Sequence, residues 1–170
     1  SKEILSVETI VESMRNISLL LQNANPDTSA IFTVSPVRHI KDGFPENQQS
    51  KANLISALHQ VLRELSSHQP PATSHYFPSY EIMMDELRDY RFYAGDMIHP
   101  NSVAIDYIWQ RVSETAITVE SQMIMKEVET IQKGLQHRPF NPNSESHQLF
   151  LSKLQDKIEK LQKQFPQIQF

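Results

Sequence analysis

An acid and a histidine stand three residues apart in the stretch GDMIHPNS, which covers residues 95–102. A carboxylate on one ring nitrogen of a histidine fixes its tautomer and stabilises the imidazolium that forms when the other nitrogen accepts a proton. A turn of this length can bring the carboxylate of Asp96 back to the ring of His99. The pair is therefore a candidate orienting acid and general base, although loops that precede helices also favour these residue types by chance.

Strands alternate with helices through the first 115 residues. The apolar spacing predicts a helix at 7–23, a strand at 30–34, a helix at 50–66, a strand at 75–77, one or two helical turns at 80–88 and a helix from about 102. Ser6 is the expected N-cap of the first helix, whose apolar face includes Ile17 and Leu21. Ser35 is expected to end the first strand, and Asn101 or Ser102 is expected to cap the helix from 102. The first strand is apolar almost throughout, so we expect it to be buried in a parallel sheet with helices as crossovers. Two strands do not make a stable sheet, and we expect the rest of the sheet to come from preceding sequence.

The connecting segments and the C-terminal part carry weaker signals. Residues 38–49 are polar and are expected to be irregular, and Pro70-Pro71 is expected to end the second helix. Apolar spacing predicts two further helices, at about 113–133 with Gly134 as C-cap and at 145–163. Together these two helices indicate a hairpin that follows the α/β part of the chain.

Composition excludes several classes of protein. A net charge of −4 argues against nucleic acid as the main partner, because phosphate binding needs a concentrated positive field. The absence of cysteine excludes disulfides and thiolate sites, and no histidine spacing suggests a metal ligand set, so we expect no metal and no cofactor. No apolar run is long enough to span a membrane. The lack of cysteine favours the cytoplasm as the location of the protein. It does not establish this location, because the chain begins without methionine and preceding sequence is expected.

Three stretches carry a resemblance to a known family. They are FTVSPVRHIKDG at 32–43, QSKANL at 49–54 and YFPSYEIMMDELRDYRFYAGDMIHPNS at 76–102. In order and spacing they resemble the GSCFA family, within the SGNH (GDSL-like) hydrolase superfamily. The resemblance implies an α/β fold in which residues 1–115 form the C-terminal part of a three-layer, flavodoxin-like parallel-sheet domain, with residues 116–170 as a helical extension.

The same resemblance implies a serine-dependent esterase, acyl hydrolase or acyltransferase. Asp96 would orient the imidazole, and His99 would act as general base and then as general acid. The substrate would be a small-molecule, saccharide or lipid ester. No Gly-Ser-Cys-Phe-Ala or Gly-Asp-Ser string occurs in the chain, and it holds only three glycines. The resemblance therefore implies that the nucleophile lies in a missing N-terminal portion and that this chain alone is inactive.

Other polar residues are candidates for a role at the same site. Arg38 and His39 follow the first strand and are candidate substrate-binding residues, Arg38 for a carboxylate or phosphate. A surface ion pair of Arg38 with one of the acids near Asp85 or Asp89 is the alternative. Ser35 is a poor candidate nucleophile because the proline that follows it has no backbone N–H to offer an oxyanion.

A second function class stays open. The chain also fits a non-catalytic α/β interaction or scaffold module that self-associates into a homo-oligomer through its C-terminal helices. If the protein is a hydrolase, the aromatic residues between 76 and 93 could form a wall of the substrate-binding site. In a hydrolase or in a scaffold module they could equally form an ordinary core, and the core interpretation is favoured.

Overall fold

A computed structural model describes residues 3–67 and 74–170 of the chain. The chain divides into two compact units, Ser1–Val112 and Ser113–Phe170, which are called unit 1 and unit 2. Unit 1 is mixed α/β and unit 2 is helical. The expected end of the second helix at Pro70-Pro71 lies outside the described residues.

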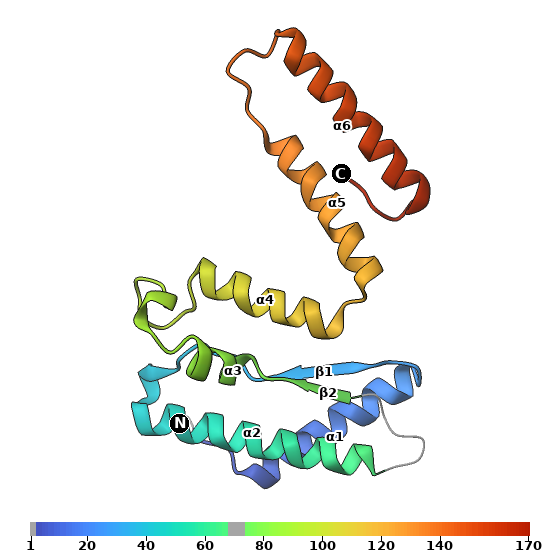
Figure 1. The fold of residues 1–170 in the computed structure, drawn as a ribbon. Helices are drawn as coiled ribbons and strands as arrows, with labels where there is room; N and C mark the ends of the chain where they lie inside the picture. The colour runs from blue at the N-terminus through green and yellow to red at the C-terminus, as the bar shows by residue number, and fades with distance from the viewer. Residues whose placement is uncertain (1–2, 68–73) are drawn as a thin grey trace. The chain divides into compact units, whose positions relative to one another are not determined.

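Unit 1 is mostly helical and contains a two-stranded parallel sheet (Figure 1). Ala30 of β1 lies opposite Ser74 of β2, and Thr33 lies opposite Phe77. The helix between the strands is the crossover, as the alternation predicts. The elements in order are α1 (Val7–Ala24), β1 (Ala30–Thr33), η1 (Ile40–Asp42), α2 (Phe44–Ser66), β2 (Ser74–Phe77), α3 (Ser79–Glu81), η2 (Ile82–Glu86), η3 (Tyr90–Phe92) and α4 (Ser102–Ala116).

The expectation that β1 is buried throughout is wrong. Successive side chains of a strand point to opposite faces of the sheet. Phe32 and Tyr76 pack against α2 on one face, whereas Ile31 on the other face is 52% exposed and His75 is also exposed. The face that carries Ile31 and His75 is therefore covered only in part in the described residues, since Phe77 on the same face is buried.

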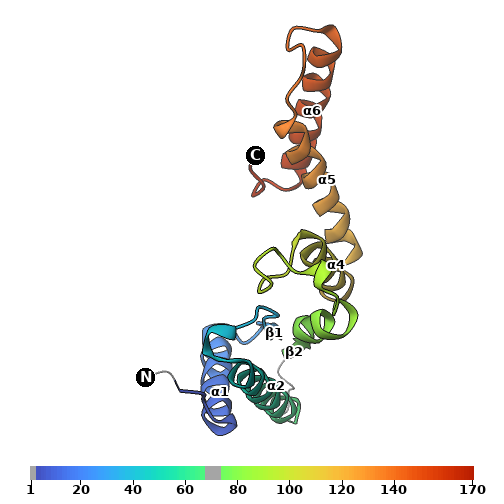
Figure 2. The ribbon, with the colours of Figure 1, turned by 90° about the vertical axis from the view of Figure 1, so that its left-hand side faces the viewer.

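Helices α1 and α2 lie side by side on the covered side of the sheet (Figure 2). Ser6 caps α1 as predicted, since its side chain accepts the N–H of Thr9. The buried stripe of α1 continues to Ser18 and leaves Ile17 and Leu21 of the predicted face exposed.

Helix α2 begins at Phe44, six residues before the predicted start. Its N-cap is Gly43, whose φ of 106° and ψ of 155° suit glycine alone, and proline occupies the first turn. The segment 38–49 is polar because it includes the exposed first turn of a helix, and it was wrongly expected to be irregular.

Replacing Gly43 by alanine is expected to lower the free energy of unfolding of unit 1 by about 1–3 kcal/mol. The residue has a positive φ, and an added Cβ would collide with the carboxylate of Glu46. Thermal unfolding followed by circular dichroism measures the change. An unchanged midpoint would contradict the backbone conformation described here, and Gly95→Ala, where a Cβ meets nothing within 4 Å, is the matched control.

A separate cluster anchors the segment that leads to the Asp-x-x-His turn. Met83, Leu87, Tyr93 and Ala104 are buried against one another, so η2, the residues after η3 and α4 form one packed group. Residues 80–88 were expected to form one or two helical turns, and they do so as α3 and the π-helical η2. This packing fixes both ends of the loop between Tyr93 and Ser102.

Unit 2 contains the last residues of α4 together with α5 (Val119–Gln136) and α6 (Glu145–Gln164). Helices α5 and α6 pack through Ile131, Leu154 and Leu161. Gly134 is not a C-cap, because it lies inside α5, where an added Cβ would come within 2.7 Å of Leu154 Cδ1. Its role is to let the two helices approach. The helix predicted from 113 is split, since Thr118 accepts the N–H of Ser121 and caps α5 anew.

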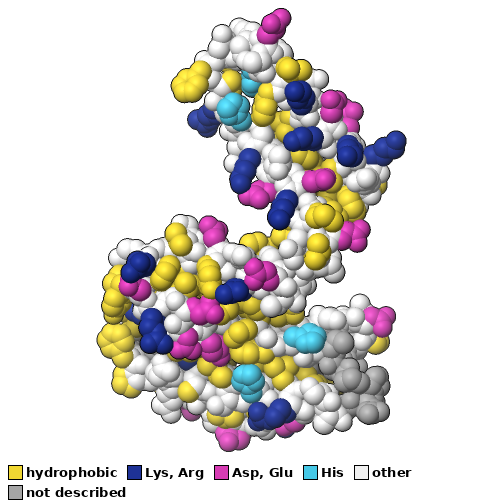
Figure 3. All heavy atoms as spheres, in the orientation of Figure 1, with side chains coloured by type: hydrophobic (Ala, Val, Ile, Leu, Met, Phe, Trp, Pro, Cys, Tyr) yellow, Lys and Arg dark blue, Asp and Glu magenta, His cyan; other side chains and the backbone are white. Residues whose placement is uncertain are grey.

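Acidic and basic side chains are interspersed on the face shown in Figure 3. Within residues 3–67 and 74–170, no helix is both long enough and apolar enough to span a bilayer.

Candidate active site

Residues 94–99 form a tight turn that presents the acid and the histidine. The N–H of Met97 donates to the Ala94 carbonyl at 2.9 Å, and the N–H of Ala94 donates to the His99 carbonyl at 2.8 Å. Met97 has a φ of 59°, a left-handed conformation that costs a residue with a Cβ. Backbone outliers of this kind concentrate at functional sites, where surrounding contacts hold them in place.

The carboxylate of Asp96 organises the turn. Its Oδ1 accepts the backbone N–H groups of Ile98 at 2.9 Å and of His99 at 3.0 Å. Its Oδ2 lies 2.6 Å from Nδ1 of the His99 ring. The contact that the three-residue spacing predicts is therefore present, and one carboxylate holds both the backbone and the imidazole.

These contacts also set the protonation states. The backbone N–H and the ring of His99, together with the N–H of Ile98, lower the pKa of Asp96 to about 2. A carboxylate ionised at neutral pH has no proton to donate, so Nδ1 of His99 must carry the hydrogen of the 2.6 Å contact. In the neutral ring Nε2 is then the proton acceptor. The His99 side chain is 58% exposed, which leaves room for a reacting group.

The titration of Asp96 is expected to have its midpoint near pH 2 in the folded chain. The folded pKa lies below the ordinary value of 3.8, so the stabilisation of the turn is present above about pH 4 and is lost as the pH falls toward 2. The carboxyl carbon shift of Asp96 and the amide shifts of Ile98 and His99 report it by NMR. A midpoint near 4 would contradict the hydrogen bonds described, and Asp96→Asn confirms the assignment.

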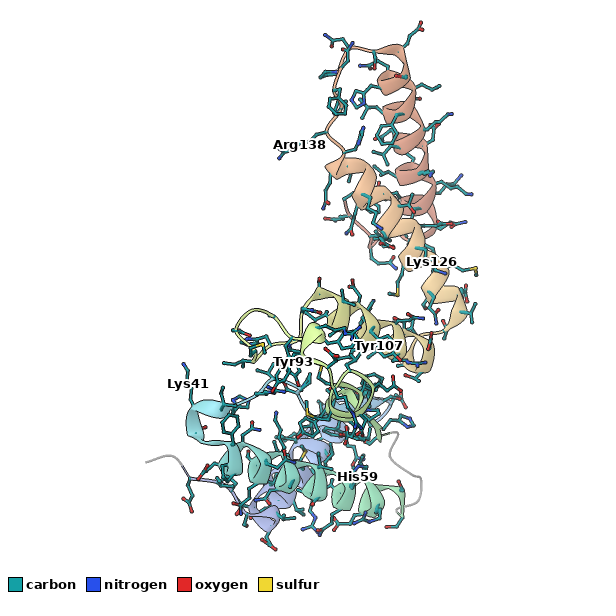
Figure 4. All side chains as sticks on the ribbon, turned by 60° about the vertical axis from the view of Figure 1, so that its left-hand side comes forward. Lys41, His59, Tyr93, Tyr107, Lys126 and Arg138 are labelled. Carbon is teal, nitrogen blue, oxygen red and sulfur yellow. The ribbon has the colours of Figure 1, made fainter. Side chains whose placement is uncertain are left out.

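The residues that follow the dyad tie it to α4. Oδ1 of Asn101 accepts the N–H of Ala104 at 3.1 Å, and its Nδ2 donates to the carbonyl of Arg91 at 2.6 Å. Tyr93 and Pro100 form an isolated antiparallel bridge, and Tyr93 lies where the loop leaves η3 (Figure 4). The predicted capping role of Asn101 is confirmed, and the dyad stands just before the N-terminus of a 15-residue helix.

Arg38 lies between β1 and η1 and holds the same turn. Its backbone N–H donates to the Ile98 carbonyl and its guanidinium donates to the Met97 carbonyl, both at 3.3 Å. The guanidinium carbon lies 4.0 Å from the ring centre of Tyr93. Asp85 pairs with Arg88, Asp89 with Arg91 and Glu86 with Arg111. Among the described residues Arg38 forms no ion pair with an acid of this segment, so the alternative is wrong. A role in substrate binding stays a prediction.

The structure does not bring His39 to this turn. The backbone N–H of His39 donates to Oδ1 of Asn47 at 2.7 Å. His39 lines a cavity of about 520 Å³, and the lining of this cavity also includes Glu3, Asp42 and Glu46. Ser35 ends the strand region as expected, and its Oγ accepts the N–H of Val37 at 3.3 Å. Neither residue shares a described contact with Asp96 or His99.

Sequence reasoning missed one residue of this region, Lys51. Its residue surface is 3% exposed, and its ammonium donates to the Ser35 carbonyl at 2.6 Å. A lysine in a polar helix is usually solvated. The helical spacing does indicate this burial. Lys51 lies one turn before Leu54 and Ile55, on the side of α2 that carries the core residues Leu58 and Val61.

Within the described ranges, no group of three or more histidine, aspartate or glutamate side chains lies close enough together to hold a metal ion.

Comparison with known families gives two matches. A model of the GSCFA family matches residues 1–112, and a model of the GSCFA domain protein, C-terminal domain, matches residues 128–170. Neither the search of curated proteins nor the search of solved structures found a match.

Proposed function

Because the chain belongs to the GSCFA family, we propose that it supplies the orienting acid and the general base of a serine-dependent ester hydrolase or acyltransferase of SGNH type. The observation that carries the proposal is the 2.6 Å contact between Asp96 Oδ2 and His99 Nδ1 at an exposed turn. The nucleophilic serine and the oxyanion donors belong, in this proposal, to sequence that precedes Ser1.

The proposed reaction uses each ring nitrogen for one purpose. Nε2 of His99 accepts the proton of the serine hydroxyl while the serine oxygen attacks the ester carbonyl carbon. The carboxylate of Asp96 stabilises the imidazolium that results. The imidazolium then gives the proton to the alcohol that leaves, and an acyl-serine remains. Water or an acceptor alcohol repeats the sequence in reverse, which gives hydrolysis in the first case and acyl transfer in the second.

The state of the sheet supports a larger domain. Parallel sheets in α/β proteins are usually covered on both faces and contain more than two strands. In the described part of unit 1, β1 and β2 are the strands of the sheet, and one of its faces exposes Ile31 and His75. Added strands and helices from preceding sequence would complete the three-layer fold that the family resemblance implies.

A comparison of two lengths of protein tests the proposal. The protein with the sequence upstream of Ser1 included is expected to hydrolyse p-nitrophenyl acetate and to be labelled by a fluorophosphonate, which reacts with activated serines. The 170-residue chain alone is expected to do neither. Absence of both turnover and labelling in the longer protein would overturn the proposal, as would equal turnover by the 170-residue chain.

The alternative function, self-association without catalysis, draws support from unit 2. Large apolar side chains are exposed on its helices: Val119, Met123, Leu135, Leu149 and Leu151. A second copy would cover such residues. Light scattering after size exclusion is expected to give twice the monomer mass in this case. A longer protein that dimerises and carries no reactive serine would favour this alternative over the hydrolase.

A further inference from the structure

A cavity of about 340 Å³ lies next to the turn, at the carboxyl end of β1. Ligands of α/β sheets bind at this end of the strands. Its walls come from the segment after β1, the first turns of α2, α3, η2 and η3. Two cationic side chains, Arg38 and Lys51, line it, and none of its described lining residues is acidic.

Lys51 is the unusual member of this lining. A buried ammonium loses its hydration and needs compensation from hydrogen bonds or an opposite charge. The Ser35 carbonyl accepts one of its three donors, and the ring of Tyr80 lies 5.7 Å away. Burial lowers the pKa of the Lys51 ammonium, and no carboxylate of the described residues forms an ion pair with it.

Arg38 connects the cavity to the catalytic turn. The side chain lines the cavity and also donates to the Met97 carbonyl, one residue after Asp96. The guanidinium lies over Tyr93 and within 5.7 Å of the ring centre of Tyr90, whose side chain also lines the cavity. A group bound between Arg38 and Lys51 would therefore lie beside the residues that present His99.

The remaining walls suit a short organic group. Met84, Ile40 and Phe44 are apolar, and the amides of Asn47 and Gln48 add neutral donors. The amino-terminal end of α2 does not add to the positive field, because the carboxylate of Glu46 lies against Gly43 there. The attraction for a negative charge thus rests on Arg38 and Lys51.

We propose that this cavity binds the oxyanion, a carboxylate or a phosphate, of a negatively charged ester substrate. The inference rests on the proposed function and narrows its substrate class to esters that carry such a group near the scissile bond. Arg38 gives the planar pair of donors that suits either oxyanion, and Lys51 adds a buried point charge.

Direct binding tests the site without any need for activity. Butyrate and butyl phosphate are titrated into the 170-residue chain and followed by amide NMR, with butanol as the neutral probe. Shifts are expected at Arg38, Gln48 and Tyr80 for at least one anion and not for butanol. The anion that binds more tightly identifies the source of the oxyanion.

Two variants that each lose one positive charge distinguish a specific anion site from nonspecific electrostatic attraction. Lys51→Gln is expected to weaken anion binding by about tenfold or more. Lys41→Gln is expected to change it by less than about twofold, because Lys41 is exposed on η1 and extends away from the cavity (Figure 4). Equal weakening in both variants, or no anion shifts in the cavity, would overturn the inference. Lys51→Met serves if the glutamine variant does not fold.

Turnover by the longer protein links the cavity to the reaction. Mono-p-nitrophenyl succinate, which is anionic, is expected to lose about tenfold or more in kcat/KM in Lys51→Gln, whereas neutral p-nitrophenyl butyrate is expected to stay within about twofold. Turnover of both esters with no charge dependence would refute the cavity and leave the proposed function intact. Specific anion binding without any turnover would support the anion site in the cavity and refute the proposed function.

Discussion

The His99→Ala variant of the longer protein is expected to lose roughly 10³-fold or more in kcat/KM for p-nitrophenyl acetate. The alanine removes the only group in the proposed mechanism that accepts the serine proton. The loss is expected mainly in kcat, because the imidazole contributes little to ground-state binding. Initial rates over a range of substrate concentrations separate the two constants.

A matched substitution controls for the loss of an exposed imidazole. His59 lies on α2, is exposed and belongs to the same unit, so His59→Ala is expected to retain turnover within about twofold. Circular dichroism establishes that both variants are folded. An undiminished rate in His99→Ala would refute the role given to His99, and an equal loss in both variants would show that neither loss reports on the dyad.

Asp96→Asn is expected to lower kcat by about 10²–10⁴-fold with little change in KM. Asparagine keeps an oxygen that accepts the N–H groups of Ile98 and His99, so the turn is retained. Its amide, however, donates a hydrogen to Nδ1, which places the ring hydrogen on Nε2. The base then has no free electron pair at the nitrogen that faces the substrate, and the imidazolium has no carboxylate beside it.

Asp89 provides the control for this substitution. Its carboxylate also accepts a backbone N–H, that of Arg91 at 2.9 Å, and also pairs with a cation, but it contacts no histidine in the described structure. Asp89→Asn is expected to leave kcat within about twofold. A small effect of Asp96→Asn on kcat, together with unchanged amide shifts at Ile98 and His99, would contradict an orienting role for the carboxylate.

Local patterns predicted the parts of unit 1 whose determinants are local. Ser6 and the apolar stripe after it located α1 within one residue at its C-terminal end, and the three-residue spacing located the contact of Asp96 with His99. The early start of α2 was missed because the signal, a glycine with positive φ followed by a first-turn proline, lies in a polar stretch without apolar period.

Contacts between distant segments were out of reach of such patterns. The link from Arg38 to Met97 joins residues 59 positions apart, and the burial of Lys51 depends on the end of β1 passing over α2. A single sequence records neither relation. The prediction that β1 is buried on both faces was also wrong, because an apolar run has the same composition whether or not a second layer covers it.

The left-handed backbone at Met97 allows the stability of this loop to be changed without changing the contacts of Asp96 and His99. Both of its backbone groups are engaged, the N–H with Ala94 and the carbonyl with Arg38, while the residue is 43% exposed. Asparagine tolerates this conformation better than methionine does. Exchange at position 97 thus offers a means to raise the melting temperature of the protein without disturbing a single polar group of the dyad.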